Sequence, residues 1–223
     1  MASDPRKRKR KLERRAARRG SKHKLAVKQK NAGMGQRLAA AAASPILDCT
    51  ASEDLWKLGM GWVLLSRQLP NGAIALAMFL VDRYCLGVKD ALADITGRFT
   101  YESDYLGKMR GQFQVRKLDP RAARKLIEGA VDYARQFGFP PHVDYHVARH
   151  LFGDLDGGAC AEEFEFGKDG KPIFIAGPHD TPERCRQIMS MLEHRYGPDG
   201  YHYLIPMNPA DEAEMLDETA DDW

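Results

Sequence analysis

Cysteines are few in this sequence, and they are widely spaced. The four of them, Cys49, Cys85, Cys160 and Cys185, include no closely spaced pair. A small disulfide-stabilised secreted domain has a higher cysteine density, and a zinc ribbon needs cysteine pairs at short spacing. The sequence therefore predicts free thiols in a reducing compartment.

Long apolar runs are also missing. The longest, Gly72–Val81, is too short to cross a bilayer. The first residues are charged where a signal peptide has its apolar segment. We therefore expect a cytoplasmic protein with no membrane partner.

Charge falls into three blocks. Met1–Asn31 holds fourteen Lys and Arg and two acids, a net charge of +12, and Pro209–Trp223 holds seven acids and no Lys or Arg. Since the whole chain carries +3, residues 32–208 carry −2. Blocks of like charge repel themselves and stay solvated. We predict a disordered basic arm with an Ala-rich linker over residues 1–45, a folded domain over 46–208 and a disordered acidic tail over 209–223.

Turn residues predict two β-hairpins. Asn-Gly separates the apolar runs Gly61–Arg67 and Ala73–Asp82, which is a strong signal for a hairpin. Ala73–Asp82 is apolar on both faces, so we expect a central strand. Asp-Gly separates Phe164–Phe166 from Pro172–Ala176 in the same way and predicts the second hairpin.

Capping residues predict the helices. Asp-Pro begins a helix over Asp119–Phe137 with apolar residues at helical spacing, and Thr-Pro begins another over Thr181–Gly197. Shorter helices are expected over Ser52–Leu58, with Ser52 as N-cap, and over Val88–Ile95, and a strand over Tyr201–Pro206. This order predicts a single α+β domain with two β-hairpins, several amphipathic helices and a C-terminal strand.

Three segments resemble an uncharacterised bacterial protein family. They are FLVDRYCLGVKDA (residues 79–91), GAVDYARQFGFPP (residues 129–141) and FGKDGKPIFIAGP (residues 166–178). The resemblance implies a bacterial protein with one domain over most of Gly61–Pro206. It implies no activity.

The basic arm predicts a non-catalytic protein that associates with nucleic acid, with RNA or the ribosome favoured over DNA. A net charge of +12 would neutralise many phosphates and release their counterions, whatever the base sequence. The arm has no aromatic residue to stack on bases. A solvated tail is the alternative interpretation. The predicted contacts are Arg6, Lys7, Arg8, Lys9, Arg10, Lys11, Arg14, Arg15, Arg18, Arg19, Lys22, Lys24, Lys28 and Lys30.

An enzyme is the alternative function. Asp82, Cys85, Lys89 and Asp90 follow the predicted central strand, and His142 could supply a base for a hydrolase or a nucleotide-processing enzyme. A cysteine beside a lysine and a helix N-terminus can become a thiolate nucleophile. The simpler interpretation is that Cys85 is a small buried residue, because free cysteine is among the most buried residue types.

Histidines recur at four-residue spacing after the Pro-Pro pair. His142, His146 and His150, with Asp154, have ligand types that metals use, but His142 precedes the expected start of the helix near Asp144. We therefore predict no metal and no cofactor.

A third possibility for the domain is a protein-binding accessory role in a bacterial multi-gene system such as phage defence.

Overall fold

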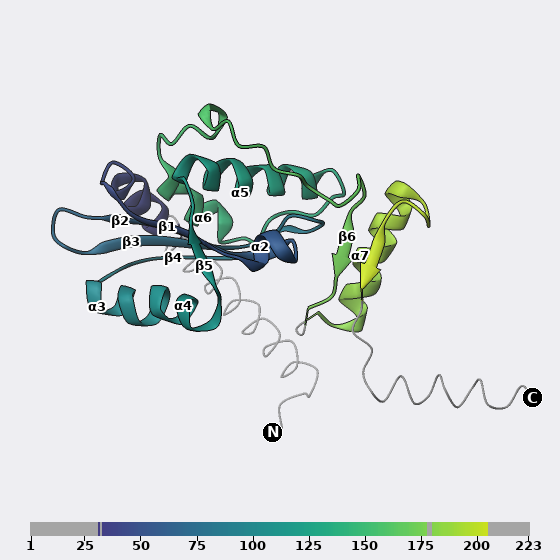
Figure 1. The fold of residues 1–223 in the computed structure, drawn as a ribbon, viewed down its shortest axis with the longest axis horizontal. Coiled ribbons are helices and arrows are strands. Elements are labelled where there is room, and N and C mark those ends of the chain that lie inside the picture. Colours follow the sequence, from purple (N-terminus) through teal and green to yellow (C-terminus); the bar gives the residue numbers. More distant parts are fainter. Residues whose placement is uncertain (1–30, 32, 178–179, 205–223) are drawn as a thin grey trace, which may run out of the picture.

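The structure is a computed structural model that describes residues 31, 33–177 and 180–204. Its largest element is a five-stranded antiparallel sheet, seen nearly edge-on in Figure 1, with the strand order β4-β3-β2-β1-β5. The strands are β1 (Ile46–Ser52), β2 (Met60–Gln68), β3 (Ile74–Asp82), β4 (Gly87–Thr96) and β5 (Val115–Lys117).

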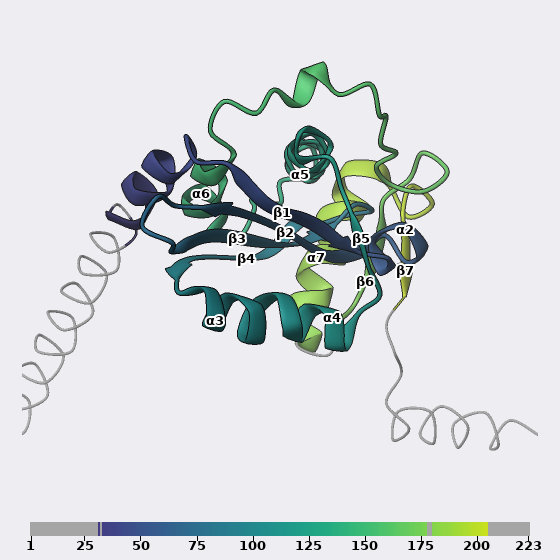
Figure 2. The same cartoon turned by 60° about the vertical axis from the view of Figure 1, so that its left-hand side comes forward.

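Helices cover both faces of this sheet (Figure 2). One face carries α5 (Pro120–Arg135) and α6 (Tyr145–Ala148), and the other carries a continuous helical stretch. That stretch consists of α3 (Arg98–Thr100), the π-helix η1 (Tyr101–Gly107) and α4 (Lys108–Gln112). Each face therefore has its own apolar core. The α+β prediction is confirmed.

The predicted first hairpin is β2–β3. Leu69 N donates to Ala73 O at 2.8 Å, and Gly72 in the turn has a φ of +82°. Glycine adopts that conformation without the steric cost that a Cβ brings. β3 pairs with strands on both sides and is buried except at Leu80, as its apolar sequence predicts.

Both long helices begin at the predicted caps. The Asp119 carboxylate accepts from Arg121 N at 2.7 Å at the start of α5, and Thr181 Oγ1 accepts from Arg184 N at 3.2 Å at the start of α7 (Pro182–Tyr196). In both helices proline follows the cap, where its missing N–H costs no helical hydrogen bond. The predicted helix boundaries are thus confirmed at their N-terminal ends.

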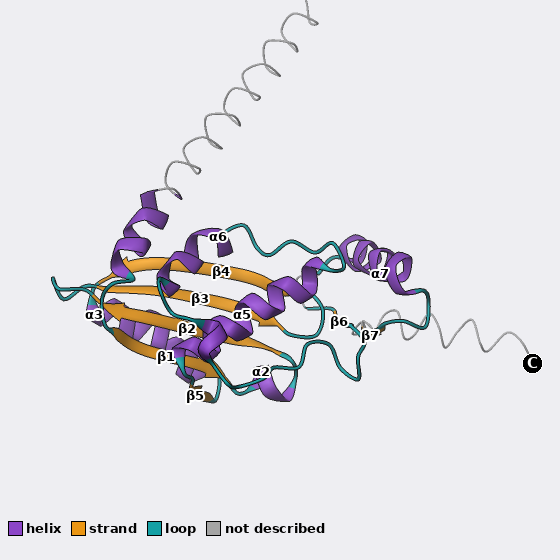
Figure 3. Cartoon of the chain, turned by 90° about the horizontal axis from the view of Figure 1, so that it is seen from above, coloured by secondary structure: helices purple, strands orange, loops and turns teal. Residues whose placement is uncertain are grey.

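A second, two-stranded parallel sheet lies beyond one end of the main sheet, next to α7 (Figure 3). It pairs β6 (Ile173–Ile175) with β7 (His202–Leu204) and is tied to the main sheet by Ile173 N donating to Tyr84 O at 3.1 Å. β7 lies in the predicted C-terminal strand, whose last two residues fall outside the described residues. The remaining short elements are α2 (Asp54–Lys57), η2 (Arg149–Phe152) and η3 (Gly157–Ala159).

The predicted second hairpin is wrong, although its turn forms. Asp169 and Gly170 have φ values of 52° and 76°, and Lys168 bridges to Lys171. Phe164–Phe166 forms no strand, because the Arg83 guanidinium holds the Glu165 carbonyl at 2.8 Å, and β6 pairs with β7 instead.

The predicted helix over Val88–Ile95 is also wrong, since this segment is β4. A β-bulge leaves Lys89 without a partner on β3, because Val81 pairs with Val88 and Leu80 pairs with Asp90. The extra residue shifts the alternation of side chains. Val88 and the residue three positions later, Ala91, therefore both face the α5 core, a spacing that resembles a helix.

Two boundaries also differ from the predictions. Ser52 ends β1, where its Oγ accepts from Trp62 N at 2.9 Å, and Glu53 precedes α2 instead. Residues 33–41, in the expected linker, are helical and bury Leu38 completely in the core beside α5. Packing thus begins before the expected boundary at residue 46.

Among the described residues, no helix has the length and apolar character needed to cross a membrane.

Candidate nucleic-acid interface

The basic arm joins the domain beside α6. Its fourteen predicted contact residues lie outside the described part of the chain. Asn31, at its end, donates through Nδ2 to Asp144 Oδ1 at 3.4 Å. Gly35 lies against the His150 ring, since a Cβ added there would come within 3.2 Å of His150 Cδ2. The residue that ends the arm, Asn31, therefore lies beside α6, and Gly35 lies beside η2.

The buried Arg67 side chain ties the far end of helix 33–41 to the domain. Its guanidinium donates to Ser44 O at 2.7 Å, to Leu151 O at 3.0 Å and to Phe152 O at 3.1 Å. These carbonyls belong to the segment after helix 33–41 and to η2. One side chain thus joins the segment after helix 33–41 to η2, and its three hydrogen bonds offset much of the cost of burying its charge.

A groove opens between helix 33–41 and η2. We call it the root groove; its volume is about 480 Å³. The spacing of its residues on α6 and η2 places three cationic or imidazole side chains on one side. Its lining includes Ala39, Arg124, His146, Arg149, His150 and Phe152.

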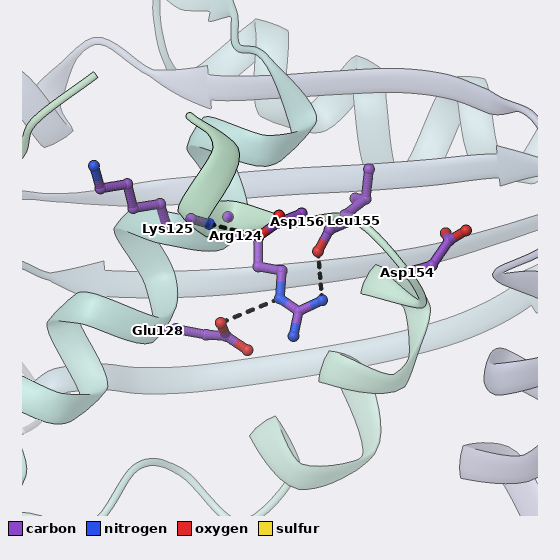
Figure 4. A pocket seen from close by; sticks show the side chains of 8 residues that line it. Arg124, Lys125, Glu128, Asp154, Leu155 and Asp156 are labelled. Atoms are coloured by element: carbon purple, nitrogen blue, oxygen red, sulfur yellow. Dashed lines mark hydrogen bonds and ion pairs between the residues drawn. The ribbon is translucent and has the colours of Figure 1, made fainter. Parts of the chain in front are cut away.

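Glu128 orients the two arginines of the root groove. Its Oε2 lies 3.1 Å from Arg124 Nε, and its Oε1 lies 3.2 Å from Arg149 Nη2. Arg124 also donates to Leu155 O at 2.5 Å (Figure 4). These contacts hold both guanidinium groups in fixed positions, and the Arg149 side chain remains 41% exposed.

A neighbouring hollow of about 450 Å³ shares Arg124 but has a different charge (Figure 4). It is lined by Lys125 and by three carboxylates, Glu128, Asp154 and Asp156. Lys125 Nζ is already 2.6 Å from Glu163 Oε1. This mixed-charge hollow offers an anion less attraction than the root groove does.

Asp82 and Cys85 form part of the turn between β3 and β4. The buried Asp82 carboxylate accepts from the N–H groups of Tyr84, Cys85 and Leu86 at 2.9, 3.0 and 3.1 Å. Burial raises its pKa, which these hydrogen bonds and the charge of Lys89 oppose. Asp82 therefore stabilises the turn between β3 and β4 through hydrogen bonds to its backbone N–H groups.

Cys85 is completely buried in an apolar cluster with Phe174, Cys185 and Ile188. Burial raises the pKa of its thiol, and the charge of Asp82 raises it further. A nucleophilic cysteine needs exposure and a lowered pKa. The geometry matches the interpretation of Cys85 as a core residue.

The other predicted catalytic residues point elsewhere. Lys89 Nζ pairs with Asp180 Oδ2 at 3.3 Å. His142 Nδ1 lies 3.7 Å from Asp90 Oδ1 and 3.9 Å from Asp144 Oδ2, close to Asn31 at the arm root. The structure thus brings His142 and Asp90 together but leaves the Cys85 thiol enclosed.

The candidate metal ligands from the sequence also lie in different places. His146 on α6 and His150 on η2 line the root groove, whereas Asp154 lines the mixed-charge hollow. Across the described residues, no group of three or more His, Cys, Asp or Glu is placed to hold a metal ion.

Sequence reasoning missed Arg124, Glu128 and Arg149. The first two are four residues apart on α5, a spacing that predicts an ion pair. The approach of Arg149 to Glu128 at 3.2 Å depends on how α6 and η2 pack, and no local pattern marks it.

A polar network under η1 was missed as well. Tyr101 donates to Asp48 Oδ2 at 2.7 Å, and its hydroxyl lies 2.9 Å from Ser66 Oγ. Burial raises the pKa of the Tyr101 hydroxyl, so it stays protonated and joins η1 to β1 and β2.

Comparison of the chain with protein-family models, with curated proteins and with solved structures finds no match.

Proposed function

We propose that this protein binds RNA without catalysis and that its basic arm supplies most of the affinity. The observation that carries the proposal is the net charge of +12 over Met1–Asn31, against −2 over residues 32–208. Release of counterions from RNA favours binding to such a cationic segment. The domain, with its near-neutral charge, adds little long-range attraction.

The junction between arm and domain supports this role. Helix 33–41 buries Leu38, and Arg67 ties the following Ser44 to η2. Because the arm ends on a fixed element, RNA bound by the arm is brought to a defined face of the domain. That face carries α6 and η2.

The hydrolase alternative has less support from the geometry. It needs an accessible thiolate, whereas Cys85 is completely buried, and Lys89 pairs with Asp180. The protein-binding accessory role stays a prediction. Among the described residues, the large apolar side chains that are exposed include Phe99 on α3, Met191 and Tyr196 on α7, and Tyr203 and Leu204 on β7.

Fluorescence anisotropy with a labelled single-stranded RNA of about 20 nucleotides, long enough for several phosphate contacts, tests the proposal. The full chain is compared with a chain lacking Met1–Lys30, which keeps Asn31 and its bond to Asp144. We expect the full chain to bind with an affinity that falls steeply with salt, and the truncated chain to lose most binding while its Tm is unchanged.

A matched control keeps the length of the arm and replaces its fourteen Lys and Arg with Gln. We expect this variant to behave like the truncated chain, because positive charge provides the attraction. Single-stranded DNA of the same sequence reports how far the domain discriminates between the two sugars. Unchanged affinity and salt dependence in the truncated chain would refute the proposal.

A further inference from the structure

The root groove has the chemistry of a phosphate site. Arg124, Arg149, His146 and His150 line it, and the described residues around it contribute no carboxylate to that lining. Both histidines are exposed. Guanidinium and imidazole N–H groups are donors suited to the anionic oxygens of a phosphodiester.

Glu128 fixes the orientation of Arg149 but does not itself line the root groove. Arg149 makes one side-chain hydrogen bond in the described structure, to Glu128, and a guanidinium has five N–H donors. The remaining donors can reach a ligand, because the side chain is 41% exposed. A cation whose orientation is already fixed loses less rotamer entropy when it binds.

The position of the groove also indicates the ligand. Helix 33–41 forms one wall through Ala39, and the residues before this helix are the cationic arm. His150, on the other wall, lies against Gly35 of the same helix. Glu128 pairs with both arginines of the groove, so two cations face one carboxylate there and a net positive charge remains beside the arm. The neighbouring hollow has two cations, Arg124 and Lys125, against three carboxylates.

We propose that the root groove binds the phosphodiester backbone of RNA immediately next to the stretch held by the arm. The inference rests on the proposed function and adds a defined second contact to it. Arg149, His146 and His150 contact phosphate oxygens, and Glu128 and Arg124 position Arg149 and the groove wall. Contacts of this kind position RNA without reading its sequence.

Two neighbouring alanines provide a matched test. Ala39 lines the root groove, whereas Ala40, also exposed, lines a largely apolar hollow with Pro45 and Leu69 that also includes Arg37. Ala39→Glu and Ala40→Glu make the same charge change on the same helix, at nearly the same distance from the arm. With the full chain and the labelled RNA, we expect Ala39→Glu to weaken binding several-fold more than Ala40→Glu does.

The comparison needs moderate salt, since the Debye length of about 8 Å at 0.15 M suppresses the long-range part of both changes. Arg149→Gln provides a second measurement, with Arg186→Gln on α7 as its control. Arg186 is also ion-paired on a helix surface, with Glu183 at 3.2 Å. We expect Arg149→Gln to weaken binding and to reduce the slope of log affinity against log salt by about 1 for each phosphate that the variant no longer neutralises.

The outcomes separate the two proposals. If the full chain binds RNA but Ala39→Glu and Ala40→Glu weaken binding equally and Arg149→Gln matches Arg186→Gln, the groove is not a contact and the arm acts alone. If the unaltered chain shows no salt-dependent binding, the proposed function fails and the inference with it. Far-UV circular dichroism and Tm for each variant identify any loss of binding that is due to unfolding.

Discussion

Lys89 on β4 forms an ion pair with Asp180, in the segment between β6 and α7. Lys89 Nζ lies 3.3 Å from Asp180 Oδ2, and the two side chains are 16% and 18% exposed. Asp180 Oδ2 also accepts from Gly177 N at 2.8 Å. The bulge residue of β4 thus reaches the segment between β6 and α7, so Lys89 holds the small sheet and α7 against the main sheet.

We expect Lys89→Met to lower the free energy of unfolding by about 1–3 kcal/mol, because it leaves the partly buried Asp180 carboxylate without its cation. Urea denaturation of Lys89→Met, Asp180→Asn and the double variant gives the coupling between the two side chains. We expect the double variant to lose less than the sum of the two single losses. Strictly additive losses would show that the pair contributes no coupling.

The sequence predicted elements whose signals are local. Asp119 and Thr181 cap helices at the expected positions, and Asn71-Gly72 turns the first hairpin. Each signal acts within a few residues, through a side-chain hydrogen bond or a backbone conformation that glycine favours. Such signals are readable without knowledge of the fold.

Predictions failed where distant pairing decides the structure. Val88–Ile95 has a helix-like spacing, but pairing with β3 and the bulge at Lys89 make it a strand. Phe164–Phe166 is held by Arg83 rather than by a hairpin partner. In the candidate site, the sequence supplied the arm and the histidines, whereas the approach of Arg149 to Glu128 depends on tertiary packing.

Ile127 is completely buried on the face of α5 that packs on the sheet. We expect Ile127→Asp to unfold the domain or to destabilise it by several kcal/mol, on the order of 3 or more, because a carboxylate there has no partner. Arg121→Asp, at an exposed position on the same helix, is the control and should keep a Tm near that of the unaltered protein. A folded Ile127→Asp variant with an unchanged Tm would exclude this face as core.

Cys85→Ser separates a core role from a catalytic one. A hydroxyl in the apolar cluster around Phe174 and Ile188 should cost about 1–3 kcal/mol of stability. We expect the affinity for RNA to stay unchanged, since Cys85 lies away from the root groove lining. Urea denaturation and anisotropy measure the two effects. A folded variant that loses a cellular or chemical activity would favour the hydrolase.

Alkaline pH should destabilise the fold, because the buried Cys49 thiol stays protonated in the folded protein. Burial, with the charges of Asp119 and Asp48, raises the pKa of Cys49 from 9.0 to about 12. Above pH 9.0 the unfolded chain releases this proton while the folded chain keeps it, so stability falls as pH rises from 9.0 toward about 12. Urea denaturation over this range should show a smaller decline for Cys49→Ala than for the unaltered protein. Equal declines would show that Cys49 does not contribute.

The two charged ends of the sequence provide the last prediction. Pro209–Trp223 holds seven acids and no Lys or Arg, whereas Met1–Asn31 has a net charge of +12. Segments of one chain that can meet do so at a high effective concentration. The acidic segment should therefore compete with RNA phosphates for the arm and weaken nonspecific binding. The other interpretation is that it contributes to solubility alone.

Deleting Pro209–Trp223 should tighten binding to a random RNA at low salt, and the gain should shrink as salt rises. Attraction between exposed charges is screened within about 10 Å at 0.1 M salt. A variant with the seven carboxylates of this segment changed to amides keeps its length and should bind as the deletion does, because charge rather than excluded volume causes the competition. If both variants match the unaltered chain across the whole salt series, the acidic segment does not act on the arm, and the affinity for RNA is set by the arm and the root groove.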